Sequence, residues 1–130
     1  MACMRVAVAV WNGRVSPVFD VASRLNIVEV FGREAASVEE HELRNDRVQG
    51  LRELGVEVLI CGAISHDLEE RVLAAGIEVV AEIRGEACDV IRAFAEDKLA
   101  RPEFSMPGCH SRRRRPGRPL IADPIFALEN

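Results

Sequence analysis

The first third of the chain alternates between apolar runs and short polar breaks, which predicts strands. Residues 5–11 (RVAVAVW) are apolar almost throughout and rich in valine, as in a central strand that is covered on both faces. Residues 26–31 (NIVEVF) repeat this β-branched pattern and end at a glycine, whereas residues 36–43 (ASVEEHEL) carry more charge. Because charge on an edge strand discourages pairing with other molecules, the three segments predict an antiparallel meander with residues 36–43 outermost.

The period then changes to that of helices alternating with strands. Residues 46–55 predict a helix with Asn45 or Asp46 as N-cap and Gly55 as the stop. Residues 65–76 predict a second helix, with Ser65 or His66 near its cap and acidic side chains, Asp67 and Glu69, complementing its N-terminal dipole. Residues 86–99 predict a third helix, whose apolar stripe is formed by Ala87, Val90, Ile91, Phe94 and Leu99.

Two further strands separate these helices. Residues 56–61 (VEVLIC) are continuously apolar after the first glutamate, and residues 77–83 (IEVVAEI) alternate. The alternation predicts that Glu78 and Glu82 point outward and that four apolar side chains point inward: Ile77, Val79, Ala81 and Ile83. The chain therefore reads as three strands in a meander followed by two strands joined through helical crossovers. This predicts an α/β domain with one mixed five-stranded sheet, in the order 3-2-1-4-5, and helices packed on it.

The composition shifts at residue 100. Residues 100–130 contain five of the six prolines and the run Arg112–Arg115, and they show no period, so we expect a domain over residues 1–99 and an irregular, Pro/Arg-rich C-terminal tail over residues 100–130. The overall net charge of -4 hides an asymmetry, since residues 1–111 sum to -7 and residues 112–130 to +3. The N-terminal apolar stretch is too short for a membrane span or a signal peptide, so we expect a soluble cytoplasmic protein with no membrane partner.

Candidate binding residues gather where two parallel strands are expected to end. The strand over residues 5–11 leads into WNGRVSPVFD (residues 11–20), and the strand over residues 56–61 leads into CGAISHD (residues 61–67). Ligands of open α/β sheets bind in the crevice at such ends, and the unpaired N–H groups of a helix start favour an anion. The expected lining of the crevice comprises Asn12, Gly13, Ser16, Asp20, Cys61 and Gly62. The alternative is ordinary loop chemistry, an Asn-Gly turn with Val18 and Phe19 filling the core.

The cysteines and histidines supply candidate metal ligands. Cys61 is either a small buried hydrophobe or a ligand or redox sensor at the crevice, and His66 is either a surface residue near a helix cap or a second ligand there. Cys88 is expected to pack near the apolar stripe of the third helix, and Cys3 to be incidental. His41, on the charged outer strand, is expected to be solvated.

The tail adds an unusual motif, MPGCHSRRRR. It places the soft donors Cys109 and His110 beside Arg112–Arg115, and positive neighbours favour the thiolate form that binds metals. Such a tail suits an anionic cluster held in the crevice, with Arg112 and Arg113 offsetting its charge. The alternative is a basic tail that binds nucleic acid or nothing, although the acidic body and the scarcity of aromatic residues disfavour nucleic acid.

The segment MRVAVAVWNGRVSPVFDVASRLNIVEV resembles the opening motif of the dinitrogenase iron–molybdenum cofactor biosynthesis family, small proteins related to NifX and to the C-terminal part of NifB. The residues that carry the likeness are Asn12, Gly13, Ser16, Pro17, Phe19 and Asp20, and VLICGAIS (residues 58–65) resembles a second motif. The resemblance covers residues 4–98. It implies a ribonuclease H-like fold and non-catalytic binding of iron–sulfur or iron–molybdenum cofactor precursors, passed between cluster donor and acceptor proteins.

Other functions remain as alternatives. A metal-free interaction or regulatory module would dock on an acidic partner through the basic tail. An enzyme is disfavoured because the sequence lacks a convincing nucleophile and base, and a two-metal nuclease is excluded by a first strand without a carboxylate. We expect a monomer or a weak homodimer, since the outer strand offers an exposed edge.

Overall fold

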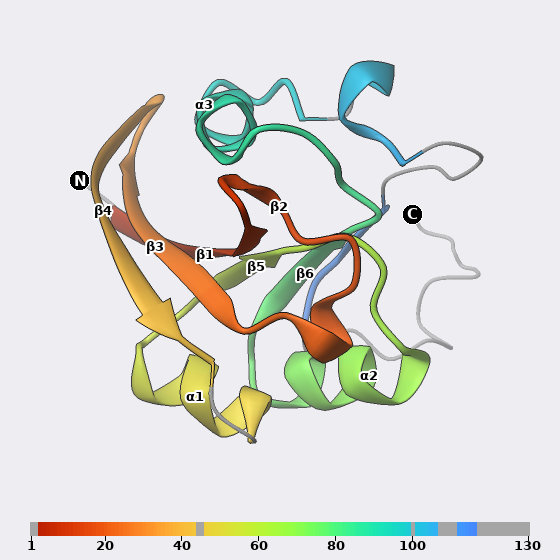
Figure 1. The fold of residues 1–130 in the computed structure, drawn as a ribbon. Helices are drawn as coiled ribbons and strands as arrows, with labels where there is room; N and C mark the ends of the chain where they lie inside the picture. Colours follow the sequence, from red (N-terminus) through yellow and green to blue (C-terminus); the bar gives the residue numbers. More distant parts are fainter. Residues whose placement is uncertain (1–2, 44–45, 100, 107–111, 117–130) are drawn as a thin grey trace, which may run out of the picture.

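The fold of this chain is a mixed sheet covered by helices on both faces (Figure 1). A computed structural model describes residues 3–43, 46–99, 101–106 and 112–116. The strands are β1 (Cys3–Trp11), β2 (Arg14–Val15), β3 (Arg24–Phe31), β4 (Glu34–Glu42), β5 (Val58–Ile60), β6 (Glu78–Ala81) and β7 (Arg112–Arg114). The α-helices are α1 (Arg47–Glu53), α2 (His66–Ala74) and α3 (Ala87–Ala95), and single 3₁₀ turns are η1 (Phe19–Val21) and η2 (Pro102–Phe104).

The sheet order is β4-β3-β1-β5-β6-β7, with β2 paired to β1. The first five of these strands are the five expected from the sequence, and they lie in the predicted order. β1 is antiparallel to β3 and parallel to β5, and β5 is parallel to β6. The carboxyl ends of β1, β5 and β6 therefore meet at one end of the sheet, which is where the sequence predicts a site.

Two apolar cores lie on opposite faces of the sheet. Alternate residues of β1 divide between them: Ala7 and Ala9 belong to the core under α1 and α2, while Val6 and Val8 belong to the core under α3. All four side chains are buried, as expected for a central strand. The three predicted helices are present, with Asp46 accepting the Gln49 N–H at the start of α1 and Ser65 accepting the Leu68 N–H at the start of α2.

The sheet differs from the prediction in its number of strands. Over the residues that the structure describes it has seven strands, because β2 forms a short hairpin with β1 and β7 pairs with β6 in antiparallel register. Arg112 lies opposite Ala81, and Arg114 opposite Val79. β7 belongs to a region expected to be irregular throughout. The arginine run forms a strand because the neighbouring α2 and β6 supply carboxylates for its side chains. Among the described residues, no helix is long and apolar enough to cross a membrane.

Candidate functional site

The Asn-Gly turn after β1 is a two-residue hairpin loop. Asn12 and Gly13 have φ angles of 52° and 76°, and the flanking pair Trp11 and Arg14 closes the loop in register. Two consecutive positive φ angles are typical of a type I′ turn, whose twist suits a β-hairpin and which favours Asn-Gly. The local sequence is thus explained by the turn that it forms.

This hairpin rests on the start of α3. The Val15 N–H donates to the Gly85 carbonyl at 2.9 Å, and the Ala87 N–H donates to the Gly13 carbonyl at 2.9 Å. The Arg14 guanidinium and the Glu86 carboxylate form an exposed ion pair at 2.6 Å. The Gly13 carbonyl therefore satisfies one of the N–H groups that a helix start leaves unpaired.

The next part of the motif packs directly on the loop that follows β5. The Ala63 N–H donates to the Pro17 carbonyl and the Phe19 N–H donates to the Ala63 carbonyl, both at 2.8 Å. A Cβ atom on Gly62 would lie 2.5 Å from the Pro17 carbonyl oxygen, so only glycine allows this approach. The two loops meet as the sequence predicts, but backbone contacts fill the space between them.

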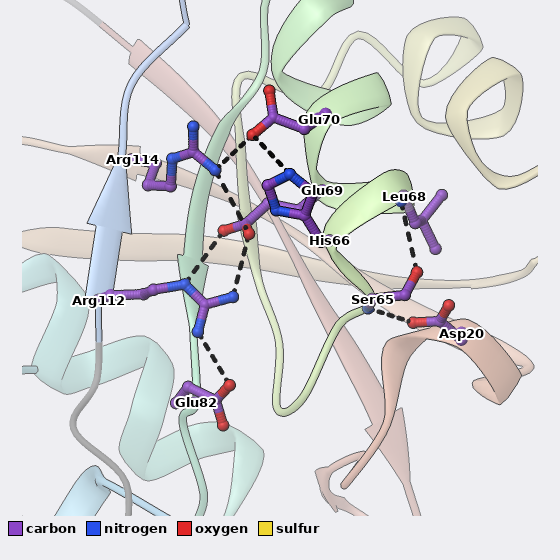
Figure 2. Close-up of polar contacts among 9 residues, drawn as sticks. All are labelled: Asp20, Ser65, His66, Leu68, Glu69, Glu70, Glu82, Arg112 and Arg114. Carbon is purple, nitrogen blue, oxygen red and sulfur yellow. Dashed lines mark hydrogen bonds and ion pairs between the residues drawn. The ribbon is translucent and has the colours of Figure 1, made fainter. Parts of the chain in front are cut away.

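Three side chains of the motif are used within the fold. Ser16 is buried, with its N–H on the Ala9 carbonyl at 2.8 Å and its hydroxyl 3.4 Å from the Val18 carbonyl. Phe19 is fully buried in the core under α1 and α2, whereas Val18 is exposed and does not fill the core. The Asp20 carboxylate accepts the Ser65 N–H at 2.9 Å, which ties η1 to the start of α2 (Figure 2).

Cys61 and His66 lie in contrasting environments. The Cys61 side chain is fully buried, and desolvation, with a further contribution from Glu69, raises the pKa of its thiol far above the ordinary range. The His66 side chain is 79% exposed, and its Nε2 lies 3.9 Å from the Glu70 carboxylate. Within the part of the chain that the structure describes, no three Cys, His, Asp or Glu side chains gather in a way that would hold a metal ion.

The two other described cysteines are exposed, and the histidine of the outer strand is partly exposed. Cys88 is exposed on α3, so the prediction that it packs in the core is wrong, because it lies beside the buried stripe and not on it. Cys3 is exposed, and its sulfur lies 3.8 Å from the Glu29 carboxylate. Desolvation, followed by the negative charge of Glu29, raises the pKa of its thiol. His41 is partly exposed and lies 3.2 Å from the Glu39 carboxylate.

Cys109 and His110 lie outside the described residues, but the residues on either side of them are placed. Before the gap, Ser105 pairs with Ile83 and the Met106 N–H donates to the Glu82 carbonyl at 3.1 Å. After it, Arg112 pairs with Ala81. Both flanking segments are therefore held at the carboxyl end of β6, next to the loops already described.

The arginines of β7 are engaged by carboxylates (Figure 2). Arg112 binds Glu69 at 3.0 Å and Glu82 at 2.9 Å, and the hydrogen bond to Glu69 raises its pKa. Arg113 forms an ion pair with Glu78. The charges of Arg112 and Arg113, which were expected to offset the negative charge of a bound cluster, are thus balanced by glutamates of the protein itself.

These glutamates are the site residues that sequence reasoning missed. Glu78 and Glu82 were expected to point into solvent, but their side chains are only 12% and 16% exposed because β7 covers them. Glu69 was expected to complement a helix dipole, and its side chain is 3% exposed beneath Arg112. The available signal was the match between four acidic residues near α2 and β6 and four consecutive arginines in the tail.

Comparison with known proteins supports the family resemblance. Residues 2–97 match the family model described as "Dinitrogenase iron-molybdenum cofactor". The solved structure of PH0822 is 27% identical with a TM-score of 0.70, over 73% of this chain and 92% of that one. The Thermotoga protein TM1290 is 28% identical with a TM-score of 0.56, over 81% and 99%. The apo form of the orange protein from Desulfovibrio gigas, 21% identical with a TM-score of 0.60 over 84% and 96%, shares the fold, and a search of curated proteins found no match.

Proposed function

Since residues 2–97 match its model, this chain belongs to the dinitrogenase iron–molybdenum cofactor family, and we propose that it binds and carries an anionic iron–sulfur or iron–molybdenum cluster without catalysing a reaction. The cluster is cargo, received from a donor protein and released to an acceptor. A carrier needs ligands that hold the cargo through few bonds. Thiolate and imidazole, the donors of Cys109 and His110, suit such clusters.

One observation carries this proposal: the chain is held at the carboxyl end of β6 on both sides of Cys109 and His110. Met106 is bonded to the Glu82 carbonyl and Arg112 is paired with Ala81. In the sequence, Cys109 is three positions from Met106 and three positions from Arg112. This supports assigning the two soft donors to the end of the sheet where ligands of α/β proteins bind.

The rest of the site would serve as a base for the cargo. The hairpin at Asn12 and Gly13 and the loop at Gly62 are fixed by backbone hydrogen bonds, so they present an ordered surface at this end of the sheet. Burial of Cys61 disfavours the thiolate form that binds metal, so the proposal assigns cluster ligation to Cys109 and His110 before Cys61 and His66.

The metal-free interaction module is the competing function. It requires arginines that are free to meet an acidic partner, whereas Arg112, Arg113 and Arg114 are each paired with a glutamate. This pairing counts against the interaction module, and it equally withdraws Arg112 and Arg113 from the cargo, so the carrier proposal depends on Cys109 and His110 and not on these arginines.

The test is anaerobic reconstitution of the full chain with iron and sulfide, or with a preformed iron–sulfur cluster, followed by iron counting and visible absorption. Wild type is expected to take up iron with a thiolate-to-iron absorption band. The double variant Cys109→Ala/His110→Ala is expected to lose both signals, and Cys61→Ala to retain them.

Cys88→Ala is the matched control, because Cys88 is an exposed cysteine on α3. It removes one thiol without touching the carboxyl end of β6, so its iron content should equal that of wild type. Wild type that stays free of iron with either cargo would contradict the proposal and return attention to the interaction module.

A further inference from the structure

Strand β7 is short, so ion pairs of its side chains contribute more to its attachment than its few backbone pairs do. It contributes three residues to the edge of the sheet, and each of its arginines forms an ion pair. We infer that Glu69 of α2 is a positioning residue that locks β7 against β6, so that the edge of β6 opens only when this lock is released. The inference deepens the proposed function, on which its consequence for cargo rests.

The geometry of the lock is a fork around one carboxylate. Arg112 donates from Nη2 to Oε1 of Glu69 at 3.0 Å and from Nε to Oε2 at 3.3 Å, and Nη1 of Arg114 lies 3.5 Å from Oε1 (Figure 2). Paired N–H donors on one carboxylate combine strength with a fixed orientation. Glu69 thereby receives two residues of β7 that lie on the same face of the strand.

Burial makes this contact differ from a surface ion pair. The Glu69 side chain is 3% exposed, and the cations within ion-pair distance of it in the described residues belong to Arg112 and Arg114. Charge-assisted contacts at a carboxylate that is screened from water are stronger than the same contacts on an open surface. Undocking of β7 breaks the contacts of Arg112 and Arg114 with Glu69 together, so the charge opposes the release of the strand.

The arginines alternate along β7 in the way that a strand requires. Arg112 and Arg114 meet carboxylates of α2, with Glu70 accepting from Arg114 at 2.7 Å, whereas Arg113 meets Glu78 and lies over the ring of Phe94 on α3, 5.4 Å from its centre. A period of two places successive side chains on opposite faces. The arginines of β7 thus contact the helices on both faces of the sheet.

The carboxyl end of β6 adds a second attachment. Glu82 has a φ angle of +64°, a left-handed conformation that is uncommon outside glycine. In this conformation its carbonyl accepts the Met106 N–H at 3.1 Å while its carboxylate binds Arg112 at 2.9 Å. The lock at Glu69 therefore holds β7 at the same end of the sheet to which Met106 is attached.

The competing explanation is that β7 simply covers the edge of the sheet, as short charged edge strands do. Exposed ion pairs contribute little to such a contact. Under that explanation the strand would stay docked without the Glu69 charge, and under the inference it would not.

Limited proteolysis of the full-length protein with trypsin separates the two. Trypsin cuts after arginine, so cleavage after Arg112, Arg113 or Arg114 reports an undocked β7, and cleavage after Arg33 in the exposed β3–β4 turn serves as an internal reference. In Glu69→Gln, which keeps the shape and removes the charge, cleavage in β7 relative to Arg33 should rise about tenfold or more, because cleavage follows the population of the open form. An unchanged ratio would overturn the inference.

One control and one further test variant complete this experiment. Asp67→Asn, on the same helix, removes a carboxylate that pairs with Arg71 and not with β7, so its ratio should equal that of wild type. If Glu69→Gln unfolds the protein, cleavage at Arg33 also rises, and Arg112→Gln then decides: cleavage after Arg113 and Arg114 should increase while cleavage at Arg33 does not.

Iron uptake in the same variants tests the link to cargo separately. Loss of protection together with loss of iron in Glu69→Gln supports both the lock and its role in placing the donors. Loss of protection with full iron uptake supports the lock and contradicts its role in cargo binding, while wild type that binds no iron contradicts the carrier function and leaves the proteolysis result as the measure of the lock.

Discussion

The motif segment over residues 16–20 and strand β7 both reach the carboxyl end of the parallel strands, but different forces hold them there. The first is joined to the loop after β5 by backbone hydrogen bonds at Pro17 and Ala63, and its Phe19 is fully buried. The second makes a three-residue ladder with β6 and ion pairs with four glutamates: Glu69, Glu70, Glu78 and Glu82.

The difference separates a part of the fold from a part that docks on it. Removing Phe19 from its place opens the apolar core, so residues 16–20 move only when the domain unfolds. β7 contributes no side chain to that core cluster, and its undocking would break ion pairs and uncover carboxylates. The proposed carrier needs one element that can change position, and β7 is the element held by charge and a short ladder of hydrogen bonds.

The largest loss of stability is expected from a substitution at Gly62, which residues 16 and 17 contact through their backbone. In Gly62→Ala the new Cβ would lie 2.5 Å from the Pro17 carbonyl oxygen and 2.6 Å from that of Ser16, both backbone atoms. Because neither can rotate away, we expect a loss of about 3 kcal/mol in the free energy of unfolding, at the upper end for overpacking, measured by urea denaturation.

Gly50→Ala is the matched control, since a Cβ there meets no atom within 4 Å. In the middle of α1 it should raise stability by about 0.5–1 kcal/mol. Equal effects of the two substitutions would show that residues 16–20 do not press on Gly62, and the contrast with β7 would fail.

The sequence predicts the strands and helices of this fold because the residue patterns that indicate them are local. The valine run of β1, the caps Asp46 and Ser65 and the stop at Gly55 each depend on neighbours in the chain. The five-strand order followed from them through the handedness of crossovers. The meeting of residues 11–20 with residues 61–67 followed from the parallel pairing of β1 with β5.

The details of the site depended on long-range contacts that no local pattern encodes. Cys61 and His66 are close in sequence, but one side chain enters the core and the other is exposed on α2. Glu69 was assigned to a helix dipole because its partner, Arg112, is 43 residues away. A strand such as β7, composed of arginines, has no β propensity to reveal it, and forms because its carboxylate partners are already assembled by α2 and β6.

A second, smaller effect tests whether Cys61 is enclosed in the same core as Phe19. Burial raises the pKa of its thiol, so the folded protein keeps this proton as the pH rises, while the unfolded chain loses it above about 8.5. The unfolded state then binds fewer protons than the folded state, and stability falls with rising pH, by up to about 1.4 kcal/mol per pH unit above that value.

Unfolding free energies of wild type and Cys61→Ala should therefore converge by about 2 kcal/mol between pH 8 and 10, because the variant lacks this proton. Cys88→Ala, which removes an exposed thiol, should keep the wild-type slope. A Cys61→Ala slope equal to that of wild type would mean that the thiol is accessible, and Cys61 would return as a candidate ligand.

The smallest effect is expected at Arg14, in the hairpin that leads into residues 16–20. Its ion pair with Glu86 has side chains 51% and 54% exposed, and the hairpin beneath it is already held by the bonds of Val15 to Gly85 and of Ala87 to Gly13. Arg14→Gln should therefore cost less than about 1 kcal/mol, as exposed pairs do, and 1 M salt should abolish even that difference. Urea denaturation at low and high salt, run beside Arg112→Gln, measures both. A loss at Arg14 as large as that at Arg112, and equally resistant to salt, would mean that charge holds this hairpin as it holds β7, and the distinction between backbone-held and charge-held segments would fail.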